Sequence, residues 1–412
     1  MKIEKGEESF NEELASLMEA ERKARQANNT NSSLEICVKI YNLLDNHNDI
    51  ALLISTLKTI ANKKGQFHKV VTELVRLAMR KIEEISDIHS KIAFVEGIKA
   101  ICEKKIYLEV EYARCAMILV KYNETDEKNW AEASKIIETV QIETYTSMSQ
   151  YEKIEFILYQ MKLNMLLNED LKLYIVSKKI NEKHLEEKGL ENLKFMYNLF
   201  IFSYHFGNKD FRLCSLALQK AYEAFCTAGD NKISSLDSFV TSRFPDFTQK
   251  STLVESFIAM KCLESFSMKK KEDLSAMKSS HEIYFYDNAI IRNLVDAFLS
   301  KEVTSCEVSD YSVKQLYIFS SEYDRKANLQ DVLKNELVKK NLNVASLYFT
   351  SVYIQRLSDL FKTSSDTIEE VVCQMVVENL LTAKIDRTAQ IVAFKSENNK
   401  EDVLSTWMKN VN

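Results

Sequence analysis

The chain has 412 residues, of which 46% are hydrophobic and 28% charged, and its formal net charge is −5. It contains only 6 glycines and 1 proline. Because these residues supply the dihedral angles of tight turns, their scarcity excludes a large β-sandwich, barrel or propeller. Nucleotide-binding loops are excluded too, since no two glycines lie close enough for a phosphate-binding fingerprint. The composition predicts a helical protein whose overall charge gives no general attraction to nucleic acid.

Apolar stripes with helical spacing fill the sequence from residue 33 to residue 268. Polar breaks rich in Asn, Asp and Gly separate the stripes, at 46–49, 62–65, 122–126, 168–170 and 207–210. Each break predicts the end of one helix and the start of the next. A stripe with its break spans about 20 residues, so two of them match the period of a stacked helical hairpin. We therefore predict an all-α fold, with a right-handed, TPR-like helical-hairpin solenoid over residues 33–268.

Other patterns flank this solenoid. Residues 1–32 are charged and rich in Asn, which predicts a charged N-terminal segment with a partly frayed helix. The polar stretch 268–273 marks the end of the solenoid, and 269–345 is expected to form the helical part of a C-terminal module. Residues 346–396 carry the pattern of a winged helix with a small β-sheet, and 397–412 predict a short C-terminal helix.

The winged-helix prediction depends on the order strand, helix, turn, helix, hairpin. The corresponding runs lie at 352–354, 356–361, 368–381, 382–386 and 391–394. Ser364 offers a hydroxyl cap for the second helix, and Asp366 places an acid in its first turn. The inward face of that helix is expected to comprise Val371, Val372, Met375, Val376 and Leu380.

The second helix of the winged helix carries four acidic residues and no basic one between Ser365 and Leu380. Its carboxylates would face phosphates, and it has no guanidinium to contact a base edge. Only Lys384 and Arg387, in the wing, are basic. We therefore expect no nucleic-acid partner.

No pattern of catalytic or metal-binding residues emerges. The six histidines are never closer than 21 residues, which excludes the H-E-x-x-H and H-x-H patterns of metal-dependent hydrolases. Cys115 and Cys226 lack the surrounding signature of a nucleophile, so a structural thiol is favoured at both positions. His205 is interpreted as a satisfied interhelical histidine. We expect no enzymatic activity, no metal and no cofactor.

The eight cysteines never form a C-x-x-C pair. We interpret them as small buried hydrophobic residues in a reducing compartment. The first residues lack the apolar core of a signal peptide, and no apolar run approaches the length that spans a bilayer. We therefore expect no membrane partner.

Two segments are candidate protein-interaction sites. The first is the strand Ile391, Val392, Ala393 and Phe394, which is interpreted as an open edge of the winged-helix sheet that can pair with a neighbouring chain. The second is the C-terminal helix, where Leu404, Trp407 and Met408 form a one-sided apolar stripe. This stripe can pack back on the winged helix or join a helical bundle with other chains.

A helical-repeat solenoid that ends in a winged helix resembles the PCI family of the proteasome lid, the signalosome and an initiation factor. Within that family the chain is similar to the fifth non-ATPase subunits of the proteasome regulatory-particle lid. The matching segments are 85–92, 105–114, 140–148, 154–163, 176–181 and 383–394. Between 210 and 330 only the spacing of helices is retained. The family also continues past the equivalent of Trp407 into the helical bundle of the lid, which leaves the share of this chain in that bundle open.

The resemblance implies a non-catalytic scaffold of ubiquitin-dependent proteolysis, present in cytoplasm and nucleus. Its implied partners are the sixth and ninth non-ATPase subunits, the metal-dependent deubiquitinase subunit, the ATPase ring and the core-particle α-ring. Two alternatives share the architecture: a PCI subunit of the signalosome, and a PCI scaffold of an mRNA-export or translation complex. The segment 140–148 is more similar to the proteasome version than to the signalosome version.

Overall fold

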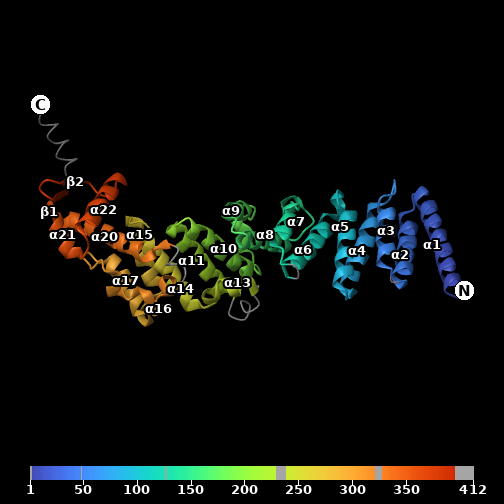
Figure 1. The fold of residues 1–412 in the computed structure, drawn as a ribbon, viewed down its shortest axis with the longest axis horizontal. Helices are drawn as coiled ribbons and strands as arrows, with labels where there is room; N and C mark the ends of the chain where they lie inside the picture. The colour runs from blue at the N-terminus through green and yellow to red at the C-terminus, as the bar shows by residue number, and fades with distance from the viewer. Residues whose placement is uncertain (1, 48, 126–127, 229–237, 321–326, 395–412) are drawn as a thin grey trace, which may run out of the picture. The chain divides into compact units, whose positions relative to one another are not determined.

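The computed structural model describes residues 2–47, 49–125, 128–228, 238–320 and 327–394 (Figure 1). Contacts divide the chain into two compact units, residues 1–181 and residues 182–412, and each is described by itself. No helix among the described residues combines the length and the apolar character that a membrane span requires.

Unit 1 consists of helices that follow one another in chain order. They are α1 (Lys2–Gln26), α2 (Thr30–Asn46), α3 (Ile50–Ala61), α4 (His68–Glu84), α5 (Ile88–Cys102), η1 (Ile106–Leu108), α6 (Glu109–Thr125), α7 (Trp130–Glu138), η2 (Ile142–Thr144), α8 (Gln150–Leu166) and α9 (Asp170–Ser177). Each α-helix packs against the next, and α2 also meets α4, α3 meets α5 and α4 meets α6. Neighbour-to-neighbour packing of this kind is characteristic of helical-repeat proteins.

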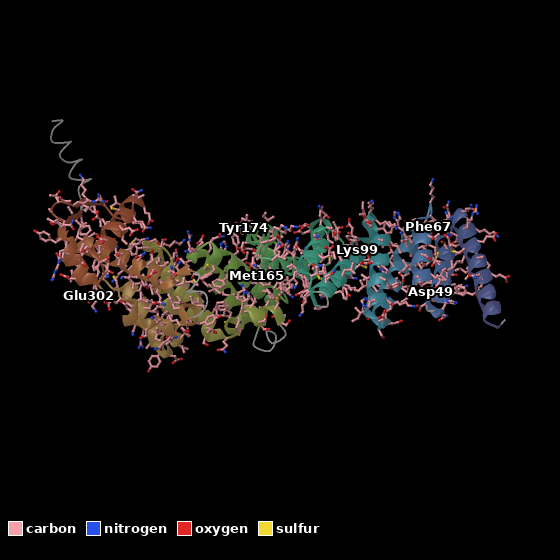
Figure 2. All side chains as sticks on the ribbon, in the orientation of Figure 1. Asp49, Phe67, Lys99, Met165, Tyr174 and Glu302 are labelled. Atoms are coloured by element: carbon pink, nitrogen blue, oxygen red, sulfur yellow. The ribbon has the colours of Figure 1, made fainter. Side chains whose placement is uncertain are left out.

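The predicted polar breaks lie at helix ends, and in the break at 46–49 a side chain also caps the next helix. Asp49 accepts a hydrogen bond from the backbone N–H of Leu52 at 3.1 Å and so begins α3 (Figure 2). Asp87, which lies outside the predicted breaks, does the same for Ser90 at 2.8 Å at the start of α5. Such caps satisfy backbone donors that a helix leaves without intrahelical partners.

Unit 2 begins with helices that continue this pattern. They are η3 (Glu182–Glu186), α10 (Glu191–Gly207), α11 (Phe211–Ala228), α13 (Ser238–Arg243), η4 (Pro245–Thr248), α14 (Lys250–Leu263), α15 (Met268–Ser280), α16 (Glu282–Asp287), α17 (Ala289–Leu299), η5 (Val308–Tyr311), η6 (Val313–Gln315), α18 (Tyr317–Ser320) and α20 (Leu329–Tyr348). The helix α10 packs on α11, α11 packs on α14, and α14 meets both α17 and α20.

A winged helix follows α20. Its elements are β1 (Ser351–Tyr353), α21 (Ile354–Phe361), α22 (Ser365–Val377), β2 (Ala383–Asp386) and β3 (Ile391–Phe394). The three strands form one antiparallel sheet in the order β1-β3-β2. Ser364 caps α22 by accepting from the N–H of Thr367, as its sequence context predicted.

The predicted fold class, helical repeats that end in a winged helix with a small sheet, is confirmed. The right-handed sense of the repeats and the proposed domain boundaries stay predictions, and the expected C-terminal helix at 397–412 lies outside the described residues. One expectation about α22 is wrong. Val371, Val372 and Met375 are buried, but Val376 is 36% exposed, because it lies at the margin of the buried face.

The cysteines are all free thiols, and six of the eight are buried as expected. Cys226 and Cys373 are exposed, so the prediction of burial is wrong for these two. Cys373 lies on the outer face of α22, between the inward residues Val372 and Met375. Burial raises the pKa of the Cys102 and Cys262 thiols to about 12, which keeps these two groups protonated at neutral pH.

We expect a thiol reagent to label two cysteines per native chain and all eight after unfolding in denaturant. Peptide mapping by mass spectrometry identifies the labelled positions, which should be Cys226 and Cys373. Variants with serine at these two positions serve as the control and should show almost no labelling in the native state. Rapid labelling of Cys102 or Cys262 in the native chain would contradict the described core.

Candidate protein-interaction surface

The winged helix is joined to the preceding helices through α20, a helix surrounded by protein on several sides. It packs against α14, α17 and α22. Its apolar residues Leu333, Leu337 and Leu342 are fully buried. Four polar residues in the same stretch are also buried: Glu336, Lys339, Lys340 and Asn341. Buried charges are stable only when they are paired and hydrogen-bonded. The partners of these four residues therefore show how α20 is held against its neighbours.

Lys270 of α15 is the first partner. Its side chain is 2% exposed, and its ammonium donates to the backbone carbonyls of Cys262 at 2.8 Å and Glu264 at 2.5 Å. These carbonyls lie at the end of α14, so Lys270 holds the α14–α15 corner together. The same ammonium lies 4.4 Å from the centre of the Phe298 ring of α17 and 3.7 Å from Oε2 of Glu336. Burial lowers the pKa of Lys270.

Glu336 connects Lys270 to the winged helix. Its Oε1 lies 3.1 Å from the ammonium of Lys339, one turn along α20. Lys339 in turn lies 3.9 Å from the carboxylate of Glu378, the C-cap residue of α22. Burial raises the pKa of Glu336, while the ammoniums of Lys270 and Lys339 oppose that shift. The chain of charges therefore runs from α15 through α20 to the winged helix.

Lys340 and Asn341 bind the segment between α17 and η5. The Lys340 ammonium donates to the carbonyl of Glu302 at 2.5 Å (Glu302 is labelled in Figure 2). The Asn341 amide donates to the carbonyl of Thr304 and accepts from its N–H at 3.1 Å. Two residues later, the N–H of Cys306 donates to the carbonyl of Phe361 at the end of α21. The winged helix is thus fixed from two sides.

Sequence reasoning missed this network. The sequence predicts a polar stretch at 268–273, whereas α15 begins at Met268 and Lys270 is almost fully buried. The signal in α20 is weak, because its leucines at 329, 333, 337 and 342 alternate with charged residues, as they can on a surface helix. The sequence therefore does not say that these charges are buried or where their partners lie.

The structure corrects the prediction of an open edge at Ile391, Val392, Ala393 and Phe394. These residues form β3, the central strand, and they pair with β1 on one side and β2 on the other. The second strand of a hairpin can be either a central or an edge strand of its sheet. The order of the strands along the chain therefore did not reveal that β3 is central. The outer edges of the described sheet belong to β1 and β2.

The β1 edge has backbone groups available for pairing. Phe394 donates to the carbonyl of Thr350, and Ile354 donates to the carbonyl of Gln390, both at 2.8 Å. Since hydrogen bonding alternates along an antiparallel strand, Ser351 and Tyr353 direct their N–H and C=O groups away from β3. Among the described residues no strand covers this side. By contrast, β2 carries the charged side chains of Lys384 and Asp386, which discourage edge pairing.

Exposed apolar side chains lie next to the β1 edge. Leu347, Tyr348, Phe349 and Tyr353 are between 43% and 74% exposed, and we call them the aromatic patch. They lie within seven residues of chain that join the end of α20 to the start of α21. Clustered exposed aromatic residues are characteristic of protein interfaces. The patch was not singled out from the sequence. The other predicted contact residues, Leu404, Trp407 and Met408, lie outside the described residues.

The remaining sequence candidates do not converge into a reaction centre. Among the described residues no group of three or more His, Cys, Asp or Glu side chains is arranged to hold a metal ion. Cys115 is fully buried, and burial raises the pKa of its thiol. His205 contacts the ring of Tyr204 at 5.2 Å. On α22, the carboxylate of Glu369 pairs with Arg387 of the wing, whose side chain stays 76% exposed.

We expect Glu336→Gln to destabilise unit 2, because it leaves the ammoniums of Lys270 and Lys339 without a buried counter-charge. Breaking a buried ion pair costs about 3–5 kcal/mol. Urea denaturation of the two proteins measures the loss. The control is Asp331→Asn, the same chemical change at an exposed position of the same helix, which should cost less than about 0.5 kcal/mol. Equal effects of both changes would contradict the role of the network.

The stability contribution of Lys340 should depend on pH. Burial lowers the pKa of its ammonium to about 8 in the folded chain. In the unfolded chain the lysine keeps its proton to about pH 10.4. Between these values the unfolded chain binds more protons, so the wild type gains stability relative to Lys340→Met as the pH rises. Urea denaturation of both proteins from about pH 7 to about pH 10 measures this trend. A constant difference would contradict it.

Comparison with known proteins gives two family matches. Residues 12–229 match the model described as PSMD12/CSN4, N-terminal, and residues 314–396 match the PCI domain. The second match covers the end of unit 2 that contains α20 and the winged helix.

Several curated relatives align with nearly the whole chain. The 26S proteasome regulatory subunit rpn501 of Schizosaccharomyces pombe is 25% identical over 97% of this chain and 86% of its own length. The 26S proteasome regulatory subunit RPN5 of Saccharomyces cerevisiae is 26% identical over 97% of this chain and 87% of its own length. The 26S proteasome non-ATPase regulatory subunit 12 homolog A of Arabidopsis thaliana is 24% identical over 96% of this chain and 91% of its own length. The predicted PCI resemblance is confirmed: the chain belongs to the PSMD12/CSN4 family and carries a PCI domain.

Proposed function

We propose that this chain is a scaffold subunit of the proteasome regulatory-particle lid and acts in ubiquitin-dependent protein degradation. The observation that carries the proposal is the alignment with 26S proteasome regulatory subunits over 96–97% of the chain. Alignment from end to end is stronger support than a shared fold, because one fold hosts many functions. Cytoplasm and nucleus are the proposed locations.

The scaffold role requires partners, and the structure offers surfaces for them. The β1 edge with the aromatic patch suits a neighbouring PCI subunit, for which the sixth and ninth non-ATPase subunits are proposed. The deubiquitinase subunit, the ATPase ring and the core-particle α-ring are proposed partners of the helical repeats. Repeats of this kind present extended surfaces, and their rigidity allows one chain to position several partners. We propose no catalytic role for the chain.

The signalosome remains the second candidate, because the matching family model is described by both PSMD12 and CSN4. The names of the aligned relatives favour the proteasome. Affinity purification of the tagged full-length chain from its own cells, followed by quantitative mass spectrometry, separates the two. Proteasome core and ATPase subunits in near-equal amounts support the proposal. Recovery of signalosome subunits without them would overturn it.

Replacement of Tyr353 by proline tests the β1 edge. Tyr353 has φ −66°, which proline adopts without strain, and its N–H faces away from β3. The substitution therefore removes an outward donor without breaking the β1–β3 ladder. We expect Tyr353→Pro to reduce recovery of proteasome subunits with the tagged chain by about tenfold or more, since edge pairing depends on backbone donors.

Tyr353→Ala is the matched control, because it removes the same side chain and keeps the N–H. It should reduce recovery less than Tyr353→Pro does. Circular dichroism of both purified variants checks that the winged helix is intact. Full recovery with Tyr353→Pro would show that the β1 edge does not pair with a neighbour.

A further inference from the structure

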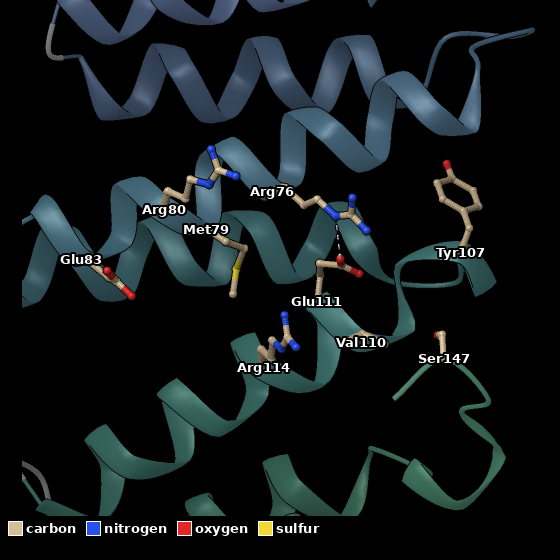
Figure 3. Close-up of a pocket in the computed structure, with 9 residues that line it drawn as sticks. All are labelled: Arg76, Met79, Arg80, Glu83, Tyr107, Val110, Glu111, Arg114 and Ser147. Carbon is tan, nitrogen blue, oxygen red and sulfur yellow. Dashed lines mark ion pairs between the residues drawn. The ribbon is translucent and has the colours of Figure 1, made fainter. Parts of the chain in front are cut away.

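A groove opens on the surface of unit 1 between α4 and α6 (Figure 3). Its volume is about 560 Å³, which falls within the range of about 300–1,000 Å³ that ligand-binding pockets have. Three arginines line it: Arg76 and Arg80 from α4, and Arg114 from α6. The chain as a whole has a net charge of −5, so three arginines around one groove differ from its overall acidic character.

The positions of the arginines follow from the helices that carry them. Arg76 and Arg80 are four residues apart, so they lie on the same face of α4. Arg114 projects from α6 into the space below them, as Figure 3 shows. Glu111, a buried residue of α6, lies 3.7 Å from Nε of Arg76 and holds that side chain over the groove. Arg114 is bound on one side by Glu152 at 2.7 Å, and half of its side chain stays exposed.

Much of the hydrogen-bonding capacity of these groups is unused. The contacts of Arg76 with Glu73 and Glu111, at 3.9 Å and 3.7 Å, are longer than a hydrogen bond. Arg80 has neither an ion pair nor a hydrogen bond within the part of the chain that the structure describes. Each guanidinium carries five N–H donors in a planar fork that fits a carboxylate. The groove therefore presents several directed donors to solvent.

The other end of the groove adds neutral donors. Tyr107, from η1, and Ser147, from the loop before α8, both line it. The ring of Tyr107 is fixed by stacking on His68 at a centroid distance of 4.1 Å. Hydroxyl groups in these positions can bind main-chain carbonyls of a peptide whose acidic side chains reach the arginines.

We propose that this groove binds an acidic peptide segment of a partner protein, with Asp or Glu carboxylates paired to Arg80, Arg114 and Arg76. Carboxylates fit better than phosphates, because Glu83 and Glu111 also line the groove and would repel a dianion more strongly. The binding site is independent of the winged helix, and it does not depend on which assembly the chain joins. It adds a second interaction surface of different chemistry to the β1 edge.

Fluorescence anisotropy with the full-length chain tests the site. The probe is a short fluorescein-labelled peptide of alternating Glu and Ser, compared with its Gln/Ser counterpart. We expect saturable binding of the Glu peptide that weakens as salt is added, and no binding of the Gln peptide. Arg80→Glu and Arg114→Glu should each weaken binding about tenfold, because each removes an attraction and adds a repulsion.

Arg22→Glu is the matched control, since Arg22 is exposed on α1, outside the groove, and its replacement changes the net charge equally. It should change the affinity less than about twofold. Equal loss of affinity with Arg22→Glu and Arg80→Glu would overturn the site. So would equal binding of the Gln peptide, absence of binding, or tighter binding of a phosphoserine peptide of the same length. None of these results bears on whether the chain co-purifies with the proteasome.

Discussion

The buried charges around α20 constrain the rest of unit 2. An ammonium or carboxylate removed from water costs several kcal/mol unless other groups replace the lost hydration. The Lys270 ammonium has its carbonyl acceptors, and the Glu336 carboxylate its counter-charges, only where the end of α14, the start of α15 and the middle of α20 come together. The same requirement, through Lys339 and Glu378, brings α22 to a defined place on α20. A shift of α14, α15 or α20 would leave Lys270 or Glu336 without its partner.

This constraint has a functional consequence, because the winged helix carries the surface proposed for partner binding. The β1 edge begins three residues after α20 ends, so the helix that holds the charges also positions the edge. A rigid edge loses little conformational entropy when a neighbouring strand pairs with it. The groove in unit 1 recognises its proposed ligand differently, through side-chain guanidinium groups. The β1 edge thus offers backbone groups and apolar side chains to a partner, whereas the groove offers charged side chains.

The sequence was sufficient for the features that depend on local patterns. Helix starts at Asp49 and Ser364 follow from capping side chains, and the order of elements in the winged helix follows from its alternating runs. The order of the strands in the sheet could not be predicted, because a central strand and an edge strand of three or four residues have the same sequence pattern. The buried Lys270 was misread for a related reason, since a lysine in a polar run is normally solvated and its partner Glu336 lies 66 residues away. The arginine groove needs α4 and α6 side by side, which spacing within one helix does not reveal.

Amide hydrogen exchange of the chain, alone and within purified proteasome, tests most directly whether α20 holds a free β1 edge ready for a partner. We expect slow exchange at residues 336–342 of α20 in both states, because the helix is buried before any partner binds. We also expect residues 347–353 to exchange rapidly in the free chain and to become protected in the assembly. Residues 391–394 should change little, since both neighbouring strands already pair with them. Unchanged exchange at residues 347–353 in an assembly that contains the chain would contradict the proposed pairing of the β1 edge.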